Sequence, residues 1–254
     1  MRRTVFLVLA GCAVFAQPSE KLEFEAASVK LVTFPKDGKY TIGSRYDPGR
    51  YTSEYVTMRD LIAEAYSVQS MSKIIGPDWI TSDSVIYSIN AKTPGQRSHR
   101  EVRVMLQHLL ASRFQLKVHT TEHSTPVYAL VVSAKGLKLI PVKFEGDDPS
   151  LAAIHPIASG AEFKHTSMKM FAGFLNNWGN LGRPVIDETG VTDLFDFNLT
   201  YATKGLRPLL DPPPDSDKPT IIEAVQALGL KLEGRQGKVT DYVIDHVERE
   251  PVEN

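Results

Sequence analysis

The stretch Tyr51–Ile89 limits the possible folds most, because its pattern predicts a strand, a capped amphipathic helix and a second strand in direct succession. Thr57 stands at the expected N-cap, and Asp60 follows three residues later, near the positive end of the helix dipole. The next apolar residues recur at the spacing of one helix face, namely Met58, Leu61, Ile62, Ala65 and Tyr66. We therefore predict a helix over Met58–Ser67 that packs one side on a sheet.

The same succession of an N-cap, a short helix and strands recurs twice in the second half of the chain. Ser167 precedes a predicted helix at Met168–Trp178, and Thr220 precedes one at Ile221–Leu228. We interpret the three segments as internal repeats of one small unit. The fold class that follows is α+β, with repeated small units of a short helix packed on an antiparallel or mixed sheet.

Two further segments are each predicted to contain a turn between two short strands. The predicted pairs are Phe114–Thr121 with Val127–Ser133 around Glu122–Pro126, and Leu230–Glu233 with Val239–Val247 around Gly234–Gly237. Before the first pair, Ser98–Arg113 is predicted to be a helix, with Ser98 as its N-cap and Glu101 as the capping-box partner.

The N-terminus predicts export. Arg2 and Arg3 give a positive start, an apolar run follows, and Ala16 ends a small-residue cleavage site, so residues 1–16 are expected to be a signal peptide. A second interpretation is open, because Leu9-Ala10-Gly11-Cys12 resembles a lipobox in which Cys12 would be lipidated. No transmembrane helix is expected after the signal is removed, since the apolar run is too short to span a bilayer. The expected location is periplasmic or extracellular.

Composition divides the remainder of the chain into two parts. Residues 146–160 are rich in Asp, Pro, Ala and Gly, which predicts a linker. It would separate an N-terminal α+β domain at residues 17–145 from a C-terminal α+β domain at residues 161–254.

Charge and cysteine content exclude two classes of function. With 29 Lys and Arg against 30 Asp and Glu, the formal net charge is -1, so no global field attracts nucleic acid or anionic membranes. We expect no nucleic-acid partner. The single cysteine, Cys12, lies in the apolar N-terminal run, so a chain cleaved after Ala16 has no thiol for disulfide, zinc or nucleophilic chemistry.

Two short motifs resemble catalytic signatures but lack the context that the chemistry needs. His119-Thr120-Thr121-Glu122-His123 matches H-x-x-E-H, which binds zinc when both histidines lie on one face of a helix. Here the motif follows a predicted strand and leads to Pro126, so we interpret it as the solvated end of a hairpin and predict no metal and no cofactor. Ser70-Met71-Ser72-Lys73 matches the acylating motif S-x-x-K, but its partner motifs do not follow.

Carboxylates between Asp187 and Asp196 provide the one catalytic alternative. Asp187, Glu188, Asp193 and Asp196 could supply a general acid and a general base, although Asp187-Glu188-Thr189-Gly190 is typical of a turn between strands. No nucleophile elbow, phosphate-binding loop or dinucleotide fingerprint occurs in the sequence. We therefore predict no catalytic residues and favour a protein that is not an enzyme.

Three aromatic residues are the candidate binding residues. Trp79, Phe174 and Trp178 could line a groove for a sugar or a peptide. The alternative is that each of them anchors a helix to a sheet, which needs no ligand.

Several ordered motifs along the chain carry a family resemblance. They are Phe24–Lys30, Thr57–Ile62 with Ala65-Tyr66, Gly76–Trp79, Leu109–Phe114, Pro126–Leu130, Gly182–Asp187 with Thr189-Gly190, Phe195–Phe197 and Val243–Glu248. In these motifs the chain resembles a large paralogous family of exported, soil-associated proteins from Acidobacteria that contain a domain of unknown function. The repeated units also look like the short N-terminal domains of secretins and TonB-dependent receptors, which is an analogy of fold alone.

The resemblance implies a module that binds other molecules outside the cytoplasm. The expected function is a non-catalytic binding module of the bacterial envelope or extracellular space, whose partner is an envelope or extracellular protein, peptide or glycan. Some members of the family carry the domain beside a membrane-embedded metallopeptidase of the antibiotic-sensor type, which implies a ligand-binding sensor ectodomain as one alternative. A secreted hydrolase that uses carboxylates near Asp187–Asp196 is the other.

Overall fold

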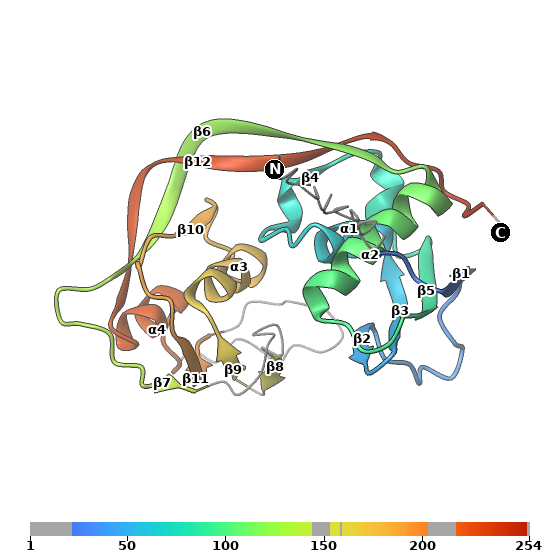
Figure 1. Ribbon diagram of the computed structural model, residues 1–254. Coiled ribbons are helices and arrows are strands. Elements are labelled where there is room, and N and C mark those ends of the chain that lie inside the picture. The colour runs from blue at the N-terminus through green and yellow to red at the C-terminus, as the bar shows by residue number, and fades with distance from the viewer. Residues whose placement is uncertain (1–21, 144–152, 158, 203–216, 253–254) are drawn as a thin grey trace, which may run out of the picture.

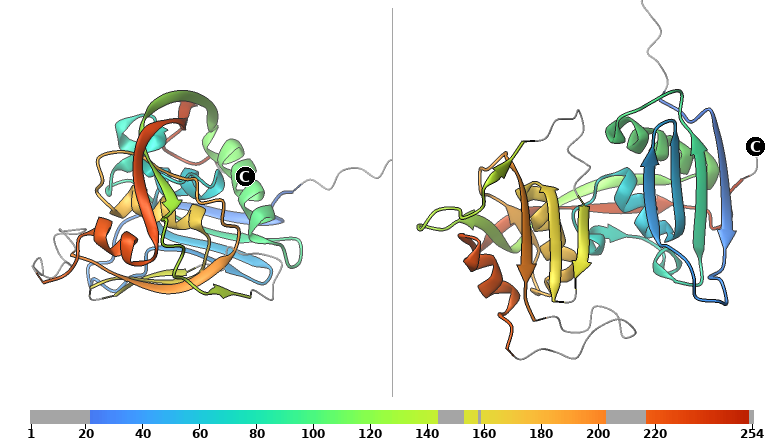
Figure 2. Two further views of the ribbon diagram at one scale, coloured as in Figure 1. Left: turned by 90° about the vertical axis from the view of Figure 1, so that its left-hand side faces the viewer. Right: turned by 90° about the horizontal axis from the view of Figure 1, so that it is seen from below.

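Two lobes lie side by side and are spanned along one edge by a long two-stranded ribbon (Figure 1). The computed structural model describes residues 22–143, 153–157, 159–202 and 217–252. The predicted signal peptide, with Cys12, lies outside these residues. Seen from below, the sheets of the two lobes lie nearest the viewer and the ribbon passes behind them (Figure 2, right). Helices and mostly antiparallel sheets are segregated in this way, so the predicted α+β class is confirmed.

The first lobe is a four-stranded antiparallel sheet with the strand order β1-β5-β3-β2. Its elements are β1 (Ala26–Val32), β2 (Gly43–Asp47), β3 (Arg50–Thr57), α1 (Met58–Ala65), the 3₁₀ turn η1 (Met71–Lys73), β4 (Ile74–Ile75), the 3₁₀ turn η2 (Asp78–Thr81), β5 (Ile86–Lys92) and α2 (His99–Phe114). Both helices begin where predicted, because Thr57 with Asp60 and Ser98 with Glu101 form complete capping boxes.

The second lobe repeats this plan with the strand order β7-β11-β9-β8. Its elements are β7 (Pro141–Val142), β8 (Ala153–Ile157), β9 (Gly160–Thr166), α3 (Met168–Trp178), β10 (Val185–Asp187), β11 (Leu194–Thr200) and α4 (Ile221–Ala227). Ser167 and Thr220 cap the two helices as predicted. Strand β8 lies within residues 146–160, where composition predicts only a linker, because this short segment pairs with β9 as an antiparallel hairpin.

The ribbon consists of β6 (Lys117–Val132) and β12 (Leu230–His246), which pair antiparallel along almost their whole length. Strand β10 joins β6 in parallel, and β4 joins β12 in parallel, so the third sheet has the order β10-β6-β12-β4. Each short strand follows the first helix of its own lobe. The ribbon is therefore the part of the structure to which both lobes are attached.

Within the described residues, the two halves of the chain are repeats of one unit. The order β1-β2-β3-α1-β4-β5-α2-β6 is matched by β7-β8-β9-α3-β10-β11-α4-β12, and matching strands hold matching places in the sheets. Helix α4 thus corresponds to α2 and not to α1. The internal repeat that we predicted as threefold is twofold, and its units are larger than expected.

Left-handed backbone recurs at matching places in the two repeats. Tyr55 (φ 55°) and His165 (φ 47°) each lie two residues before a helix N-cap, beside a register shift in β3 or β9. Ser67 (φ 53°) and Asn180 (φ 47°) follow the ends of α1 and α3. Residues other than glycine adopt this conformation at an energetic cost, so its recurrence supports the twofold repeat.

Both turns predicted inside the ribbon are wrong, because each segment is one continuous strand. Glu122–Pro126 and Gly234–Gly237 overlap in register, with Pro126 facing Gln236 and Thr125 facing Gly237. The pairing of β6 with β10 begins only at Tyr128, so one edge of β6 has no partner strand among the described residues at Pro126. A proline, which lacks a donor, is tolerated on such an edge.

Gly237 is required by close packing and not by a turn. A Cβ at this position would lie 2.6 Å from Val127 Cγ2 and 3.0 Å from Ile186 Cδ1. Glycine in a strand often marks such a close approach. The Gly-x-x-Gly pattern that predicts a hairpin therefore has a different cause here.

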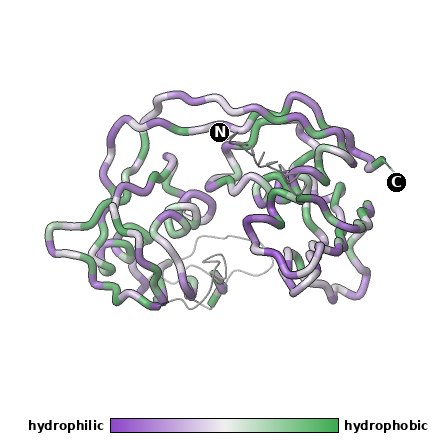
Figure 3. Tube along the Cα trace, in the orientation of Figure 1, coloured by the Kyte–Doolittle hydropathy of each residue, from purple (hydrophilic) through white to green (hydrophobic). Residues whose placement is uncertain are grey.

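Two hydrophobic cores are present, one in each lobe, and the ribbon contributes to both. The first core includes Leu116, directly before β6, and Ile244 from the end of β12, and the second includes Leu130 and Leu230 from the opposite ends of the two strands. Between the lobes the ribbon is drawn mostly in hydrophilic colours (Figure 3). The two-domain division at residues 146–160 stays a prediction, but neither core is built from one side of it alone.

Candidate functional site

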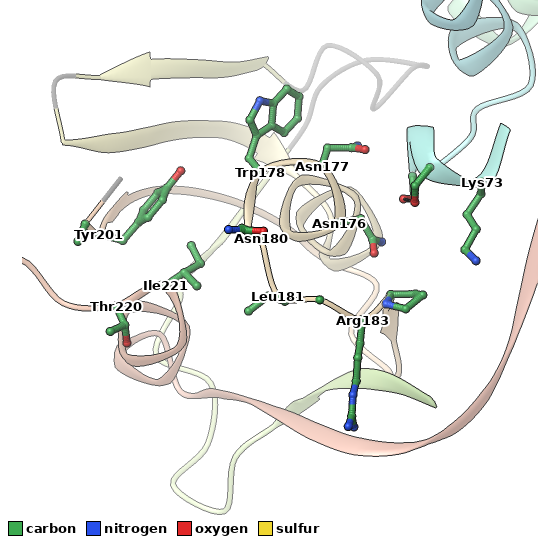
Figure 4. A pocket seen from close by; sticks show the side chains of 16 residues that line it. Lys73, Asn176, Asn177, Trp178, Asn180, Leu181, Arg183, Tyr201, Thr220 and Ile221 are labelled. Atoms are coloured by element: carbon green, nitrogen blue, oxygen red, sulfur yellow. Dashed lines mark hydrogen bonds between the residues drawn. The ribbon is translucent and has the colours of Figure 1, made fainter. Parts of the chain in front are cut away.

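A cavity of about 890 Å³ opens between the two lobes. The first lobe contributes η1, and the second contributes the end of α3, the loop that leads to β10 and the start of α4 (Figure 4). The lining includes polar, aromatic and cationic side chains, among them Lys73, Asn180, Arg183 and Tyr201. Burial raises the pKa of the Tyr201 hydroxyl. This lining residue therefore stays protonated and uncharged at neutral pH.

Asn177 fixes the two walls of this interlobe cavity relative to each other. Its Oδ1 accepts a hydrogen bond from Met71 N–H at 3.0 Å, and its Nδ2 donates to the carbonyl of Gln69 at 3.2 Å. The same Nδ2 is 3.0 Å from the carbonyl of Gly173 in the preceding turn of α3. One amide side chain therefore joins α3 of the second lobe to the segment before η1 of the first.

Asn176 fixes the loop after α3 in a similar way. Its Nδ2 donates to the Val185 carbonyl at 2.9 Å, and its Oδ1 accepts from Val185 N–H at 2.7 Å. This two-point contact holds β10 against α3. A smaller cavity of about 280 Å³ adjoins the first and shares Ser70, Lys73, Asn176 and Pro184 with it. We call the two cavities together the interlobe cleft.

Lys73 forms an ion pair at the inner edge of the cleft. Its Nζ lies 3.3 Å from Asp241 Oδ1, and His123 Nδ1 lies 3.2 Å from the other oxygen of the same carboxylate. The Lys73 and Asp241 side chains are only 19% and 13% exposed. Asp241 thus connects η1 to both strands of the ribbon, and a carboxylate so poorly solvated gains from two positive or hydrogen-bonding partners.

The H-x-x-E-H segment is part of strand β6, so the helix that its zinc-protease interpretation requires does not form. Our alternative, a solvated hairpin end, is also wrong because the strand continues through it. His119 Nδ1 lies 2.8 Å from Asp245 Oδ2, and His123 contacts Asp241. Each histidine thus meets an aspartate across the ribbon, two residues beyond its direct partner in register.

The three candidate binding residues do not form one surface. Trp79 is half-buried and packs against the first core, whereas Phe174 is buried in the second. Trp178 stacks on Phe174, with the ring centroids 5.5 Å apart, yet the residue is 42% exposed and lines the interlobe cleft. Trp178 is therefore the one of the three that is both exposed and in a cavity.

The carboxylates between Asp187 and Asp196 have separate local partners. Asp187 Oδ1 accepts from Thr189 N–H and its hydroxyl, which forms the predicted turn. Asp196 Oδ1 accepts from His165 N–H at 2.7 Å and so stabilises the left-handed residue before α3. Glu188 pairs with Arg235 on β12. These contacts hold backbone and ribbon in place, and none of the three carboxylates lines the cleft.

The S-x-x-K segment coincides with η1, and both Ser70 and Lys73 line the cleft. Ser70 Oγ lies 2.9 Å from Ser72 Oγ, while the Lys73 ammonium is directed to Asp241. The acylating motif needs the lysine to activate the serine. The observed partners are different ones, so the match reflects a structural turn.

Sequence reasoning missed most of the cleft residues. Asn176, Asn177 and Asn180 belong to no motif, and Arg183 belongs only to one that carries the family resemblance, although four polar or charged residues so close to the end of one predicted helix are a signal that could have been used. Their common position at the C-terminal end of α3 places them at the same opening.

The profile of a protein family described as "Protein of unknown function (DUF3738)" matches residues 59–247. The chain belongs to this family. The DUF3738 match runs from the first turn of α1 to the end of β12, so it includes both lobes' first helices, the whole ribbon and every residue that lines the cleft. No curated protein and no solved structure matches the chain. In the ranges that the structure describes, no helix combines the length and the apolarity needed to cross a membrane.

Proposed function

We propose that this DUF3738 chain is an exported, non-catalytic binding module that holds its ligand in the interlobe cleft. The observation that carries the proposal is the position of Trp178, a residue that is 42% exposed and lines a cavity of about 890 Å³. Large aromatic rings are normally covered in a folded protein, and an exposed one in a cavity is typical of a binding site.

The size and the rigidity of the cleft support binding. Ligand sites commonly have volumes of roughly 300–1,000 Å³ and are largely formed before the ligand arrives. Here the side chains of Asn176 and Asn177 fix the cleft walls through backbone contacts that need no ligand. A preformed site loses little conformational entropy on binding.

The roles of the acidic groups favour binding over catalysis. Asp187 and Asp196 stabilise backbone turns, and Asp241 is engaged by Lys73 and His123. A general acid or base needs access to the substrate, and these carboxylates are committed to the framework instead.

The proposal also includes export, which rests on the N-terminal sequence. The Arg2-Arg3 start, the apolar run and the cleavage site at Ala16 support secretion to the periplasm or the exterior. The likeness to exported, soil-associated proteins and to secretin-type interaction units supports a role in the envelope or the extracellular space, with a peptide or a glycan as ligand.

The test is binding and turnover by the chain that begins at Gln17, measured against a panel of glycans and peptides. Trp79 and Trp178 are the two tryptophans, so the W79F variant reports Trp178 fluorescence alone. We expect a ligand to change this fluorescence and W178A to weaken its binding by about 30-fold, the factor expected for loss of an anchoring aromatic. Release of products from the ligand, or equal affinity in W178A, would overturn the proposal.

A further inference from the structure

The interlobe cleft has a charge that differs from that of the whole chain. Within the described part of the chain, its charged lining residues are all cations, namely Lys73, Lys169, Arg183 and Lys238. Among the residues that the structure describes, no aspartate or glutamate lines either cavity, although the chain carries 30 acidic and 29 basic residues. The described lining of the cleft is thus positively charged, although the whole chain is nearly neutral.

Three of these four cations are not neutralised by a carboxylate of the described chain. Lys73 pairs with Asp241, whereas Lys169 and Lys238 form no ion pair with a described residue, and Arg183 lies over the ring of Tyr128 at 5.5 Å from its centroid. Lys169 lies on α3, Arg183 lies in the loop before β10, and Lys238 lies on β12. Like charges on the walls of one cleft reinforce each other's potential and attract anions.

We propose that the cleft binds a linear anionic polysaccharide that carries a carboxylate on successive sugar rings. This assignment rests on the cleft being the binding site, as proposed above. Cations from three separate elements call for several negative charges distributed along the ligand, and Trp178, which is 42% exposed and lines the larger cavity of the same cleft, calls for a ligand with flat, partly apolar rings. A polyuronate has both features, whereas an acidic peptide has the charges without the rings.

The experiment uses the chain from Gln17 and titrates it with oligogalacturonate, with the same oligomer as its methyl ester, and with poly-L-glutamate. The methyl ester keeps the rings and removes the charges, and poly-L-glutamate keeps the charges and removes the rings. We expect binding of oligogalacturonate alone, with affinity that falls as salt is raised.

A charge variant and a matched control locate the site. K169Q/R183Q/K238Q should weaken oligogalacturonate binding by about 100-fold, on the basis of about a factor of five for each exposed ion pair. K30Q/K39Q/K117Q removes the same charge from exposed positions outside the cleft lining and should leave affinity unchanged.

The outcomes separate this inference from the proposed function. One outcome is that oligogalacturonate and its methyl ester bind equally and that W178A binds neither. This outcome would retain the cleft as the binding site and overturn its preference for anions. Binding of poly-L-glutamate without oligogalacturonate would assign the cleft to an acidic peptide. Absence of binding to all three probes, or equal weakening by both triple variants, would also overturn the inference.

Discussion

Asn177 on α3 accepts a hydrogen bond from the backbone N–H of Met71, which lies 106 residues earlier in the chain, at 3.0 Å. The same amide donates to the carbonyl of Gln69. Because an asparagine amide has both donors and acceptors, it satisfies two backbone groups of a segment that belongs to no sheet. This amide thereby joins the two walls of the interlobe cleft.

The variant N177A should loosen the connection between the lobes. It leaves the Met71 N–H and the Gln69 carbonyl without their partner, and we expect a loss of about 2 kcal/mol in the free energy of unfolding, measured by urea denaturation. Hydrogen exchange should increase at residues 69–73. The control is N90A, at an exposed position on β5, and equal protection of residues 69–73 in N177A and N90A would contradict the proposed connection.

The variant G237A should destabilise the ribbon. Its new methyl group would lie 2.6 Å from Val127 Cγ2, so we expect a cost of about 1–3 kcal/mol, as for other overpacked sites. G234A is the matched control, because the nearest atom to a Cβ there is Arg183 Nη1 at 3.5 Å. The second change V127A should restore stability to G237A. If G234A and G237A have the same denaturation midpoint, close packing is not the reason for Gly237.

The variant E64A should destabilise the first lobe, because the Glu64 carboxylate accepts three hydroxyl hydrogen bonds there. Ser44 Oγ and Tyr46 OH donate at 2.6 Å, and Tyr51 OH donates at 2.9 Å. Burial, followed by the charge of Glu64, raises the pKa of Tyr51. We expect a loss of about 3 kcal/mol, since hydrogen bonds to charged groups contribute about 1.5–3 kcal/mol each and the partners are partly rehydrated.

Two further variants check this cluster. E64Q retains an acceptor and should lose less stability than E64A, while E54A, at an exposed position on β3, should change the unfolding free energy little. Equal urea midpoints for E64A and E54A would show that the cluster contributes nothing.

The capping box of α2 should make the stability of the folded protein depend on pH in the acidic range. Hydrogen bonds from the backbone and the side chain of Ser98 lower the pKa of Glu101 below its ordinary value of 4.5. A lowered folded-state pKa means that the contribution is present above about pH 4.5 and is lost as the pH falls through the lowered value. In E101Q the melting temperature should therefore fall less steeply between pH 4.5 and pH 3 than in the wild type.

Melting curves from pH 3 to pH 6 make this comparison. S98A should flatten the acid limb only in part, because it removes the Ser98 hydroxyl donor and keeps the backbone N–H that also donates to Glu101. E122Q, on an exposed part of β6, is the control for charge alone. Parallel acid limbs in E101Q and the wild type would exclude a role for the cap.

Local signals were sufficient to predict the helices. Thr57 with Asp60 and Ser98 with Glu101 are separated by three residues, so their effect can be read from a short window. The twofold repeat was partly visible for the same reason, since the caps recur. Its correct division was hidden, because only strand pairing shows that α4 corresponds to α2.

Long-range contacts explain what the sequence did not reveal. Gly237 is typical of a turn until Val127 and Ile186, more than 50 residues away in the chain, are seen to occupy the space of its side chain. The partners of Asn177 and Lys73 are equally distant. Trp178 was predicted as a candidate together with Phe174, but the sequence did not show that Trp178 lines the cleft and is exposed while Phe174 is buried.

Strands β6 and β12 each contribute to both cores, and this has a consequence for biosynthesis. Ile244, near the end of the chain, belongs to the core of the lobe that is made first, so that lobe leaves the ribosome or a translocation channel with its apolar interior incomplete. We therefore expect that neither half folds completely on its own. Assembly must wait for the last strand, and separately produced halves should behave as complementary fragments that acquire structure only when mixed.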